Sequence, residues 1–423
     1  MSKSMPVLAA VRRRTTLATA VATLLVAGVA RAQVTTPHLR FNQKDFEKSL
    51  TDAVGPNVMG YQYVLIHDGQ VVSQKAGGSA QTAADGDLAM TNSTPTNIGS
   101  LAKFLSGTAM LNAMEKPPAG PGSWDYGLSL QEKLDRPFTT IVPEVWALGN
   151  TPGIENITLR QLLQHRSGFD DQKIGNRTVL GYLKDPDGFL LPQYDQREYA
   201  NINFVLNGYL LPMYVAPSLQ NSLNVTISAN NLNQTDADAF VRDLCGNAMH
   251  AMMKSRIWDQ MNPQILPDCD AANTLADTAA YGYASKNDAA NGWIMSLIDN
   301  QGHCGGHGGY YMSSRALAAY LAHFSATDLI VTSEGRNAMY NEPMATDDRL
   351  VWSSATPNAW LDEHFGMPNV LWSNGITGGY RAIVVRLPQN YYLVLLTNSP
   401  DLSASQLRSA GVNAFIAGMD DNF

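Results

Sequence analysis

Three features that indicate other classes of protein are missing from this chain of 423 residues. It has no low-complexity tract, no long basic run and, after residue 32, no apolar segment long enough to span a membrane. With 45% hydrophobic and 16% charged residues, the composition is typical of a soluble globular protein with a large core, and the length suggests two or three domains. The net charge of −8 argues against nucleic-acid binding.

Two catalytic motifs are also absent. The chain contains no G-x-S-x-G, which excludes a nucleophile elbow of the α/β-hydrolase type, and no H-E-x-x-H zinc motif. His303 and His307 flank Cys304-Gly305-Gly306, but a structural zinc site needs four ligands and no second cluster supplies the others. We interpret this stretch as a glycine-rich turn, and we expect neither a metal nor an organic cofactor.

The first 32 residues differ from the rest. Lys3 and Arg12-Arg13-Arg14 precede an apolar run over residues 16–30, and Ala30-Arg31-Ala32 follows. This order is typical of a secretory signal peptide, and the run is shorter than the about 20 residues of a membrane anchor. We therefore expect cleavage after residue 32, no stable membrane insertion afterwards, and a periplasmic or secreted protein exported from a bacterium. Since the segment holds five basic and no acidic residues, the mature chain would carry a net charge of −13.

Export would bring three cysteines, Cys245, Cys269 and Cys304, into an oxidising compartment. An odd number permits at most one internal bridge. We favour the pair Cys245–Cys269, because Cys304 lies in a glycine-rich stretch nearer the expected site. Buried free thiols are the alternative, since sequence alone cannot fix the pairing.

Hairpin signals lie near both ends of the chain. Residues 61–78 alternate apolar and polar side chains around Asp68-Gly69, and residues 381–399 do so around a Pro-Gln-Asn turn. A last helix is expected over roughly 403–418. Strands from the two ends would form a single sheet.

Between these ends the pattern is mostly helical, except that residues 218–240 are polar and predict an extended loop or insertion. We therefore expect an α/β (α+β) fold. An antiparallel sheet would come from about 40–124 and 300–423, flanked by helices, and an all-helical subdomain over about 125–299 would be inserted. Residues that act together would meet at the seam between the two parts, where pockets form.

One S-x-x-K occurs in the chain, at Ser100-Leu101-Ala102-Lys103, inside a helical pattern over 97–116. Side chains three residues apart on a helix lie on one face, with β-carbons about 5–6 Å apart. Desolvation and the positive end of the helix dipole would lower the pKa of Lys103, so that it can act as base for a nucleophilic Ser100. The first turn also offers a free N–H to an oxyanion. For an isolated pair, a capping serine and a solvated lysine would be the simpler interpretation.

Two further motifs favour the catalytic interpretation. Tyr199-Ala200-Asn201 is the single Y-x-N of the chain. A phenol beside an ammonium titrates more readily, so Tyr199 could pass a proton to the leaving group in a unit coupled to Lys103. Asn201 could donate to a substrate carbonyl. Their simpler interpretation is a core tyrosine and a turn asparagine.

The third motif is Ile376-Thr377-Gly378-Gly379, which leads into an apolar strand. Glycines allow a substrate to lie close against the strand edge, and an N–H from Gly378–Tyr380 could complete an oxyanion hole. A plain glycine turn is the alternative.

In the order S-x-x-K, Y-x-N and x-T-G, the chain resembles the serine β-lactamase and penicillin-binding-protein-like hydrolases, especially the class C β-lactamase and serine esterase branch. The resemblance covers nearly all of residues 33–423 and includes the stretch ITLRQLLQHRSGF, in which His165 has a structural family counterpart. It implies the β-lactamase/transpeptidase-like fold. It also implies catalytic roles for Ser100, Lys103 and Tyr199, and substrate binding by Asn201, Ile376, Thr377, Gly378 and Gly379.

The third motif departs from the family pattern, in which lysine or histidine stands at the position of Ile376. Isoleucine cannot hold a substrate carboxylate, although Arg381 is near enough in sequence to replace the missing cation. We therefore expect an exported acyl hydrolase of neutral esters or amides, with a small-molecule ester, amide or lactam as partner. The alternatives are β-lactamase or D,D-peptidase activity, and a non-catalytic penicillin- or peptidoglycan-binding module. The sequence leaves the oligomeric state open.

Overall fold

The computed structural model describes residues 40–117, 125–146, 148, 153–174, 178–184, 195–262, 267–269, 271–294, 305–341, 348–354 and 357–420. All of these residues belong to one unit, His38–Phe423. The expected signal peptide lies outside the described residues, as do His303 and Cys304. None of the described helices is both long and apolar enough to cross a membrane.

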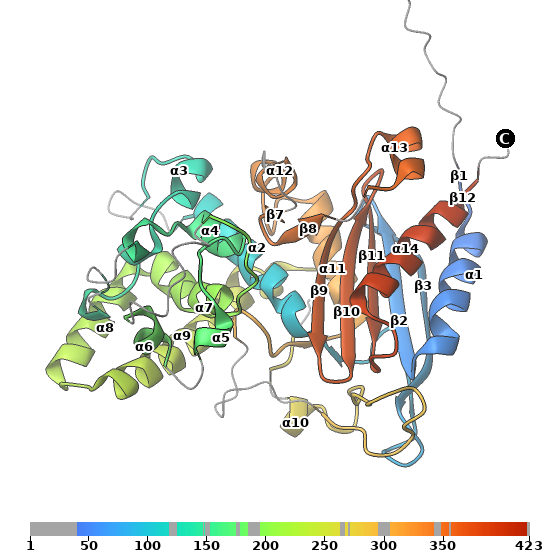
Figure 1. Ribbon diagram of the computed structural model, residues 1–423, viewed down its shortest axis with the longest axis horizontal. Helices are drawn as coiled ribbons and strands as arrows, with labels where there is room; N and C mark the ends of the chain where they lie inside the picture. The colour runs from blue at the N-terminus through green and yellow to red at the C-terminus, as the bar shows by residue number, and fades with distance from the viewer. Residues whose placement is uncertain are drawn as a thin grey trace, which may run out of the picture. The chain divides into compact units, whose positions relative to one another are not determined.

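An eight-stranded antiparallel sheet unites the two ends of the chain, which confirms the predicted fold class (Figure 1). Its strand order is β4-β3-β2-β11-β10-β9-β8-β7, so β2 from the N-terminal part pairs with β11 from the C-terminal part. Four short strands form two further pairs, β1 with β12 and β5 with β6. The strands are β1 Arg40–Phe41, β2 Gly60–His67, β3 Gln70–Gln81, β4 Leu88–Ala89, β5 Thr96–Asn97, β6 Tyr311–Met312, β7 Asp348–Arg349, β8 Trp352–Ser354, β9 Leu371–Thr377, β10 Tyr380–Leu387, β11 Tyr391–Thr397 and β12 Met419–Asp420.

Both predicted hairpins are confirmed. Asp68 and Gly69 have positive φ of 48° and 78°, the backbone that a two-residue turn between twisted strands requires. Gln389 and Asn390 likewise have positive φ, of 53° and 61°, between β10 and β11.

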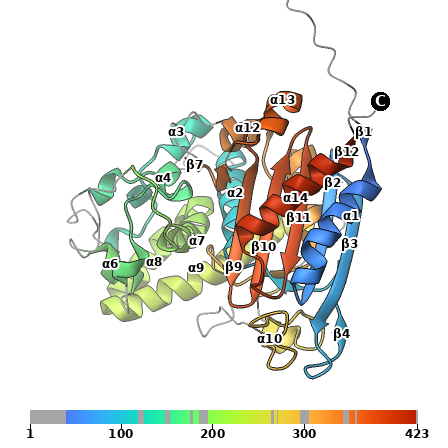
Figure 2. The ribbon, with the colours of Figure 1, turned by 45° about the vertical axis from the view of Figure 1, so that its right-hand side comes forward.

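Helices cover both faces of the sheet, because successive side chains of the central strands point to opposite faces. On one face Tyr63 and Leu393 pack against α1, Gln43–Val54, and α14, Ala404–Gly418, which confirms the predicted last helix (Figure 2). On the other face Val64 packs in the cluster that includes α2, Ala102–Glu115, and α11, Ser314–Ala326. Every residue of α2 from Ala102 to Met114 is buried, so this helix is enclosed by protein on all sides.

The named elements of the described residues between β5 and β6 are all α- or 3₁₀-helical. Helices α3 to α9 lie on the far side of α2 from the sheet, whereas α10 lies below the sheet in Figure 1. The exact boundaries of the predicted subdomain stay a prediction. These helices are α3 Leu130–Leu134, α4 Leu159–Leu163, α5 Asp171–Ile174, α6 Val179–Leu183, α7 Ile202–Val215, α8 Pro217–Ala229, α9 Gln234–Arg256 and α10 Ala271–Thr274; α12 Ser333–Asn341 and α13 Ala359–Phe365 follow β6. Single 3₁₀ turns are η1 Gly55–Asn57, η2 Gly99–Leu101, η3 Phe138–Thr140, η4 Glu144–Trp146, η6 Ile154–Asn156 and η8 Trp258–Gln260.

The prediction of an extended loop over residues 218–240 is wrong, because α8 and the first turns of α9 occupy this stretch. Leu223 and Ile227, four residues apart, are buried on one side of α8. The side chain of Asn233 caps α9 by accepting the N–H of Asp236 at 3.0 Å. The many polar residues of this stretch lie on the exposed faces and at the caps of the two helices. Only a few apolar residues mark the helical period, so the sequence pattern did not indicate a helix.

The favoured bridge between Cys245 and Cys269 is also wrong. Cys245 is a free thiol in α9, fully buried in the main core, and burial raises its pKa to about 12. Cys269 is disulfide-bonded. The helix directs Cys245 into the apolar core, and the alternative of a buried free thiol holds for this residue.

Candidate active site

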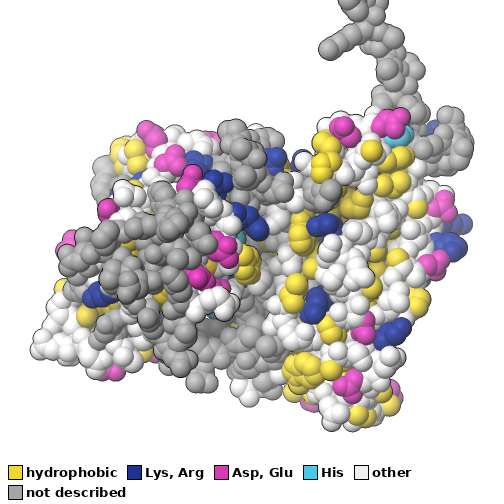
Figure 3. Space-filling view, viewed as in Figure 1, with side chains coloured by type: hydrophobic (Ala, Val, Ile, Leu, Met, Phe, Trp, Pro, Cys, Tyr) yellow, Lys and Arg dark blue, Asp and Glu magenta, His cyan; other side chains and the backbone are white. Residues whose placement is uncertain are grey.

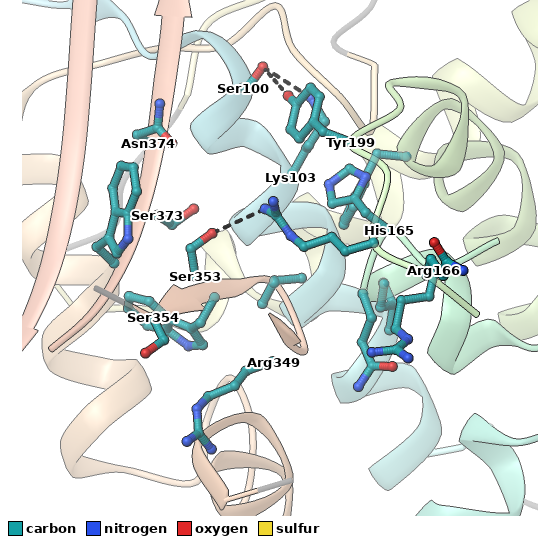
Figure 4. Close-up of a pocket in the computed structure, with 18 of the residues that line it drawn as sticks. Ser100, Lys103, His165, Arg166, Tyr199, Arg349, Ser353, Ser354, Ser373 and Asn374 are labelled. Atoms are coloured by element: carbon teal, nitrogen blue, oxygen red, sulfur yellow. Dashed lines mark hydrogen bonds between the residues drawn. The ribbon is translucent and has the colours of Figure 1, made fainter. Parts of the chain in front are cut away.

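The S-x-x-K motif lies where η2 runs into α2, as predicted, and it brings its two functional groups together. Nζ of Lys103 lies 3.0 Å from Oγ of Ser100, within hydrogen-bond distance (Figure 4). Gly99, just before the serine, has a left-handed φ of 52°, and a β-carbon there would lie 3.0 Å from the backbone nitrogen of Ile376. Glycine therefore allows β9 to approach the turn that carries Ser100.

Lys103 is almost fully enclosed, with 5% of its surface exposed. Its amine donates to three acceptors: Oγ of Ser100, Oδ1 of Asn201 at 2.8 Å and the backbone oxygen of His307 at 3.1 Å. Burial lowers the pKa of Lys103 to about 7, although the negative charge of Asp171 opposes this shift. A lysine with this pKa is half deprotonated near neutral pH and can act as a base there.

Tyr199 reaches the same serine from the segment that precedes α7. Its hydroxyl donates to Oγ of Ser100 at 2.9 Å, and Nζ of Lys103 lies 5.0 Å from the centre of its ring (Figure 4). The ring of His165 stacks on it at 4.5 Å between centroids. The expectation that this phenol titrates more readily is wrong, because desolvation raises the pKa of Tyr199. The neutral phenol is thus a proton donor at neutral pH.

Asn201 binds within the protein through both ends of its amide. Its oxygen accepts from Lys103, and its nitrogen donates to the carboxylate of Asp171 at 2.8 Å. The predicted hydrogen bond to a substrate carbonyl would use the remaining hydrogen of this nitrogen and stays a prediction.

The third motif is placed differently from the prediction. Thr377 ends β9, and Gly378 and Gly379 form the turn to β10. The residues of β9 that line the cleft are Trp372, Ser373 and Asn374.

Gly375, next to these residues, shows how closely β9 approaches the serine turn. A β-carbon on Gly375 would lie 1.7 Å from the backbone oxygen of Ile98 and 2.8 Å from the nitrogen of Leu101. Gly375 and the backbone nitrogen of Ile376 therefore lie against the serine turn, whereas Gly378 and Gly379 lie in the turn to β10. Asn374-Gly375 lies within β9 and Thr377-Gly378 at its end. Both are x-Gly pairs, and the sequence alone did not distinguish them.

The backbone N–H of Ile376 points towards the serine turn. Thr377 and Tyr380 close a two-residue turn and must therefore face each other, and N–H groups alternate between the two edges of a strand. The N–H of Ile376 thus points away from β10, to the edge where Gly99 lies. Its side chain is 52% exposed. Arg381 does not line the described part of the cleft, because its guanidinium donates to the carbonyls of Gly378 and Tyr380 at the turn.

A cleft of about 720 Å³ opens at Ser100, at the expected seam between helical part and sheet. Ser373 and Asn374 stand across from Tyr199 and His165 (Figure 4). Among its charged lining residues, Arg166 pairs with Asp195 at 3.2 Å and Arg197 donates to Oγ of Ser353 at 3.4 Å. On the outer surface seen in Figure 3, acidic and basic side chains are interspersed.

No group of three or more His, Cys, Asp or Glu side chains is arranged to hold a metal ion within the described part of the chain. Gly305 and Gly308 form a backbone bridge, consistent with the predicted glycine turn, and His307 between them offers its carbonyl to Lys103. The ring nitrogen Nδ1 of His307 is buried, and desolvation lowers the pKa of this histidine to about 4.

Residues 46–214, which include Ser100, Lys103, Tyr199 and Asn201, match the family model described as Beta-lactamase. Over these residues the chain is similar to the Beta-lactamase family. This match confirms the resemblance stated from the motifs and identifies a β-lactamase-family serine hydrolase. No curated protein matches the chain significantly.

Solved structures show that the β-lactamase fold extends over most of the chain. The octameric penicillin-binding protein homologue from Pyrococcus abyssi is 19% identical with a TM-score of 0.60, over 89% of this chain and 78% of that one. A class C β-lactamase from Rhodobacter sphaeroides is 15% identical with a TM-score of 0.60, over 88% and 98%. The D-amino acid amidase from Ochrobactrum anthropi is 16% identical with a TM-score of 0.57, over 88% and 98%. Identities this low establish the fold alone.

Sequence reasoning missed three contributors to this β-lactamase-like site: the carboxylate of Asp171, the ring of His165 and the carbonyl of His307. His165 was interpreted as structural; its Nδ1 accepts the N–H of Ala200 at 3.2 Å while its ring stacks on Tyr199. It therefore positions the tyrosine. A backbone carbonyl has no sequence signal. For Asp171 the available signal was its place just after the family-like QHRSGF stretch.

Proposed function

We propose that this β-lactamase-family serine hydrolase is an exported enzyme that hydrolyses esters or amides through an acyl-enzyme on Ser100. One observation carries the proposal: Oγ of Ser100 is hydrogen-bonded both by Lys103, whose pKa is about 7, and by the hydroxyl of Tyr199. This arrangement supplies a base and a proton relay at a single nucleophile. Export rests on the signal-peptide pattern of residues 1–32.

The reaction proceeds in two half-reactions. Neutral Lys103 accepts the proton of Ser100, whose oxygen attacks the substrate carbonyl carbon, and the N–H groups of Ser100 and Ile376 stabilise the oxyanion. The bond to the leaving group breaks as Tyr199 donates a proton to it and is reprotonated from Lys103. Water then attacks the acyl-enzyme, gives one proton back through the same groups to Ser100, and releases the acid.

The part of β9 beside the serine turn offers no positive charge to a substrate carboxylate, which supports neutral substrates. Ser373 and Asn374, the residues of β9 that line the cleft beside the serine turn, carry no charge, and the guanidinium of Arg381 is directed to the turn carbonyls. β-Lactamase or D,D-peptidase activity is the second candidate. The specific observation in its favour is the family match itself.

A substrate panel with intact-mass analysis tests the proposal. We expect turnover of p-nitrophenyl butyrate, a transient acyl adduct on Ser100, and slower turnover of nitrocefin. Ser100→Ala should lower kcat/KM by at least about 1,000-fold, since the nucleophile is removed. Ser93→Ala, at an exposed serine of a loop, is the matched control and should retain activity.

Three outcomes would change the proposal. Unchanged ester turnover in Ser100→Ala would refute the serine mechanism. Stoichiometric labelling of Ser100 without turnover would indicate a non-catalytic binding module. Nitrocefin turnover well above ester turnover would assign the protein to the lactamases.

A further inference from the structure

Asp171, the first residue of α5, bonds to the start of α7. Its carboxylate accepts the backbone N–H of Asn201 at 2.6 Å, the side-chain amide nitrogen of Asn201 at 2.8 Å and the backbone N–H of Ile202 at 3.2 Å. Two of these three bonds fix the backbone that carries Asn201, and the third fixes its side chain. Asp171 therefore determines both where this amide lies and how it is turned.

The carboxylate leaves the amide of Asn201 a single favourable orientation. A carboxylate only accepts hydrogen bonds, so the nitrogen of the amide faces Asp171. The oxygen then faces Lys103, whose amine donates to it at 2.8 Å. A flipped amide would set its oxygen against a carboxylate, which is repulsive. Its N–H groups would face the amine, where they would repel the protonated lysine and occupy the lone pair of the neutral one.

This orientation decides where the lone pair of Lys103 points. A protonated lysine has three hydrogens, and three acceptors surround it: Ser100, Asn201 and the carbonyl of His307. When Lys103 is neutral, two hydrogens remain for the oxygen of Asn201 and the fixed carbonyl of His307. The lone pair is then directed at Ser100, which is the geometry that a base needs.

We propose that Asp171 is a positioning residue of the acyl transfer, which holds the lone pair of Lys103 on the Ser100 hydroxyl through the amide of Asn201. The inference rests on the proposed function for the reaction, but the coupling between Asp171 and Lys103 is a property of the folded protein. It can therefore be tested without a substrate.

The charge of Asp171 gives a second, measurable signature. Four titratable groups face Lys103: Tyr199 from the segment before α7, His165 after α4, His307 within the glycine turn, and Asp171 on α5. Burial raises the pKa of Tyr199 and lowers the pKa values of both histidines, so these three are neutral at pH 7. The carboxylate of Asp171 raises the pKa of Lys103 against the larger effect of burial. Removing this charge should move the pKa of Lys103 below about 7.

The experiment compares Asp171→Asn with a matched control, Asp170→Asn, in the full chain. Asp170 is the adjacent acid, and its Oδ1 accepts the N–H of Gln172 at 2.8 Å, away from Asn201. The titration of Lys103 is followed by NMR with [6-¹³C]lysine, the signal being assigned by its loss in Lys103→Arg. In parallel, kcat/KM for p-nitrophenyl butyrate is measured against pH.

We expect Asp171→Asn to lower kcat/KM on the order of 10- to 100-fold, as for other partners that orient a reacting group. The lysine midpoint and the acid limb of the pH profile should both move to lower pH, whereas Asp170→Asn should change neither. When Asn201 is already replaced by alanine, adding Asp171→Asn should lower kcat/KM by less than about 3-fold, because the amide that connects Asp171 to Lys103 is already missing. Asp171→Glu keeps the charge, so its lysine midpoint should stay near that of the wild type while kcat/KM falls; it replaces Asp171→Asn if that variant does not fold.

Two results would show that Asp171 is purely structural. One is a Lys103 titration midpoint that does not move in Asp171→Asn, and the other is a loss in kcat/KM that stays as large when Asn201 is alanine. Failure of the proposed function would appear in a different experiment, namely as ester turnover that persists in Ser100→Ala. The NMR titration decides the role of Asp171 in either case.

Discussion

The two walls of the cleft carry chemistry in different ways. On the helical side Ser100, Lys103, Tyr199 and Asn201 form a network of side-chain hydrogen bonds. On the strand side, β9 presents a backbone N–H at Ile376 and the uncharged side chains of Ser373 and Asn374. The first wall depends on which side chains are present, and the second depends on how closely one backbone approaches another. Substitutions should therefore break the two walls differently.

The largest effect is expected on the side-chain wall, for Lys103→Met. This change removes the base and should lower kcat/KM by about 1,000-fold or more. In the wild type, kcat/KM should rise with pH through about 7 and then level, since Lys103 is a base only when neutral. That limb should vanish in Lys103→Met. Lys75→Met, at an exposed lysine of β3, is the control and should keep both the rate and the limb.

Persistence of the acid limb in Lys103→Met would show that a group other than Lys103 is the titrating base. In that event the network would still bind Ser100, but the lowered pKa of Lys103 would not set the pH dependence.

The contrast between the walls also explains what the sequence could predict. Ser100, Lys103, Tyr199 and Asn201 were found from residue identity and spacing, since each role needs a particular functional group. The hairpins and the last helix were found from their turn residues and apolar periods. The strand wall was assigned to the wrong x-Gly pair for two reasons. A backbone N–H is common to nearly all residue types, so no residue identity marks it, and the closeness of Gly375 to Ile98 is a tertiary contact. Asp171 was missed for a similar reason: its role exists only once α5 and α7 meet.

Gly375→Ala should break the strand wall without removing any functional group. Its new β-carbon would lie 1.7 Å from the oxygen of Ile98, so β9 must move away from the serine turn and take the N–H of Ile376 with it. We expect kcat/KM to fall about 100-fold, as for the loss of an oxyanion donor.

Gly379→Ala is the matched clash, in the turn just after the Thr377-Gly378 pair. Its β-carbon would lie 2.4 Å from the nitrogen of Tyr283, away from Ser100. Thermal unfolding should show both variants destabilised, but activity per folded molecule should fall mainly in Gly375→Ala. If Gly379→Ala were the more damaging to activity, the predicted placement of the motif at 376–379 would be supported.

The smallest effect is expected for Ile376→Ala. Ile376 contributes a backbone N–H directed at the serine turn, while its side chain is 52% exposed, and alanine keeps that N–H. We expect kcat/KM for p-nitrophenyl butyrate to change less than about 3-fold, because truncating a half-exposed side chain removes little buried area. A change above 10-fold would mean that the isoleucine side chain contacts the substrate. Gly375→Ala moves the N–H of Ile376, whereas Ile376→Ala leaves it in place. A large loss of kcat/KM in the first variant and almost none in the second would show that this wall acts through its backbone and not through the side chain of Ile376.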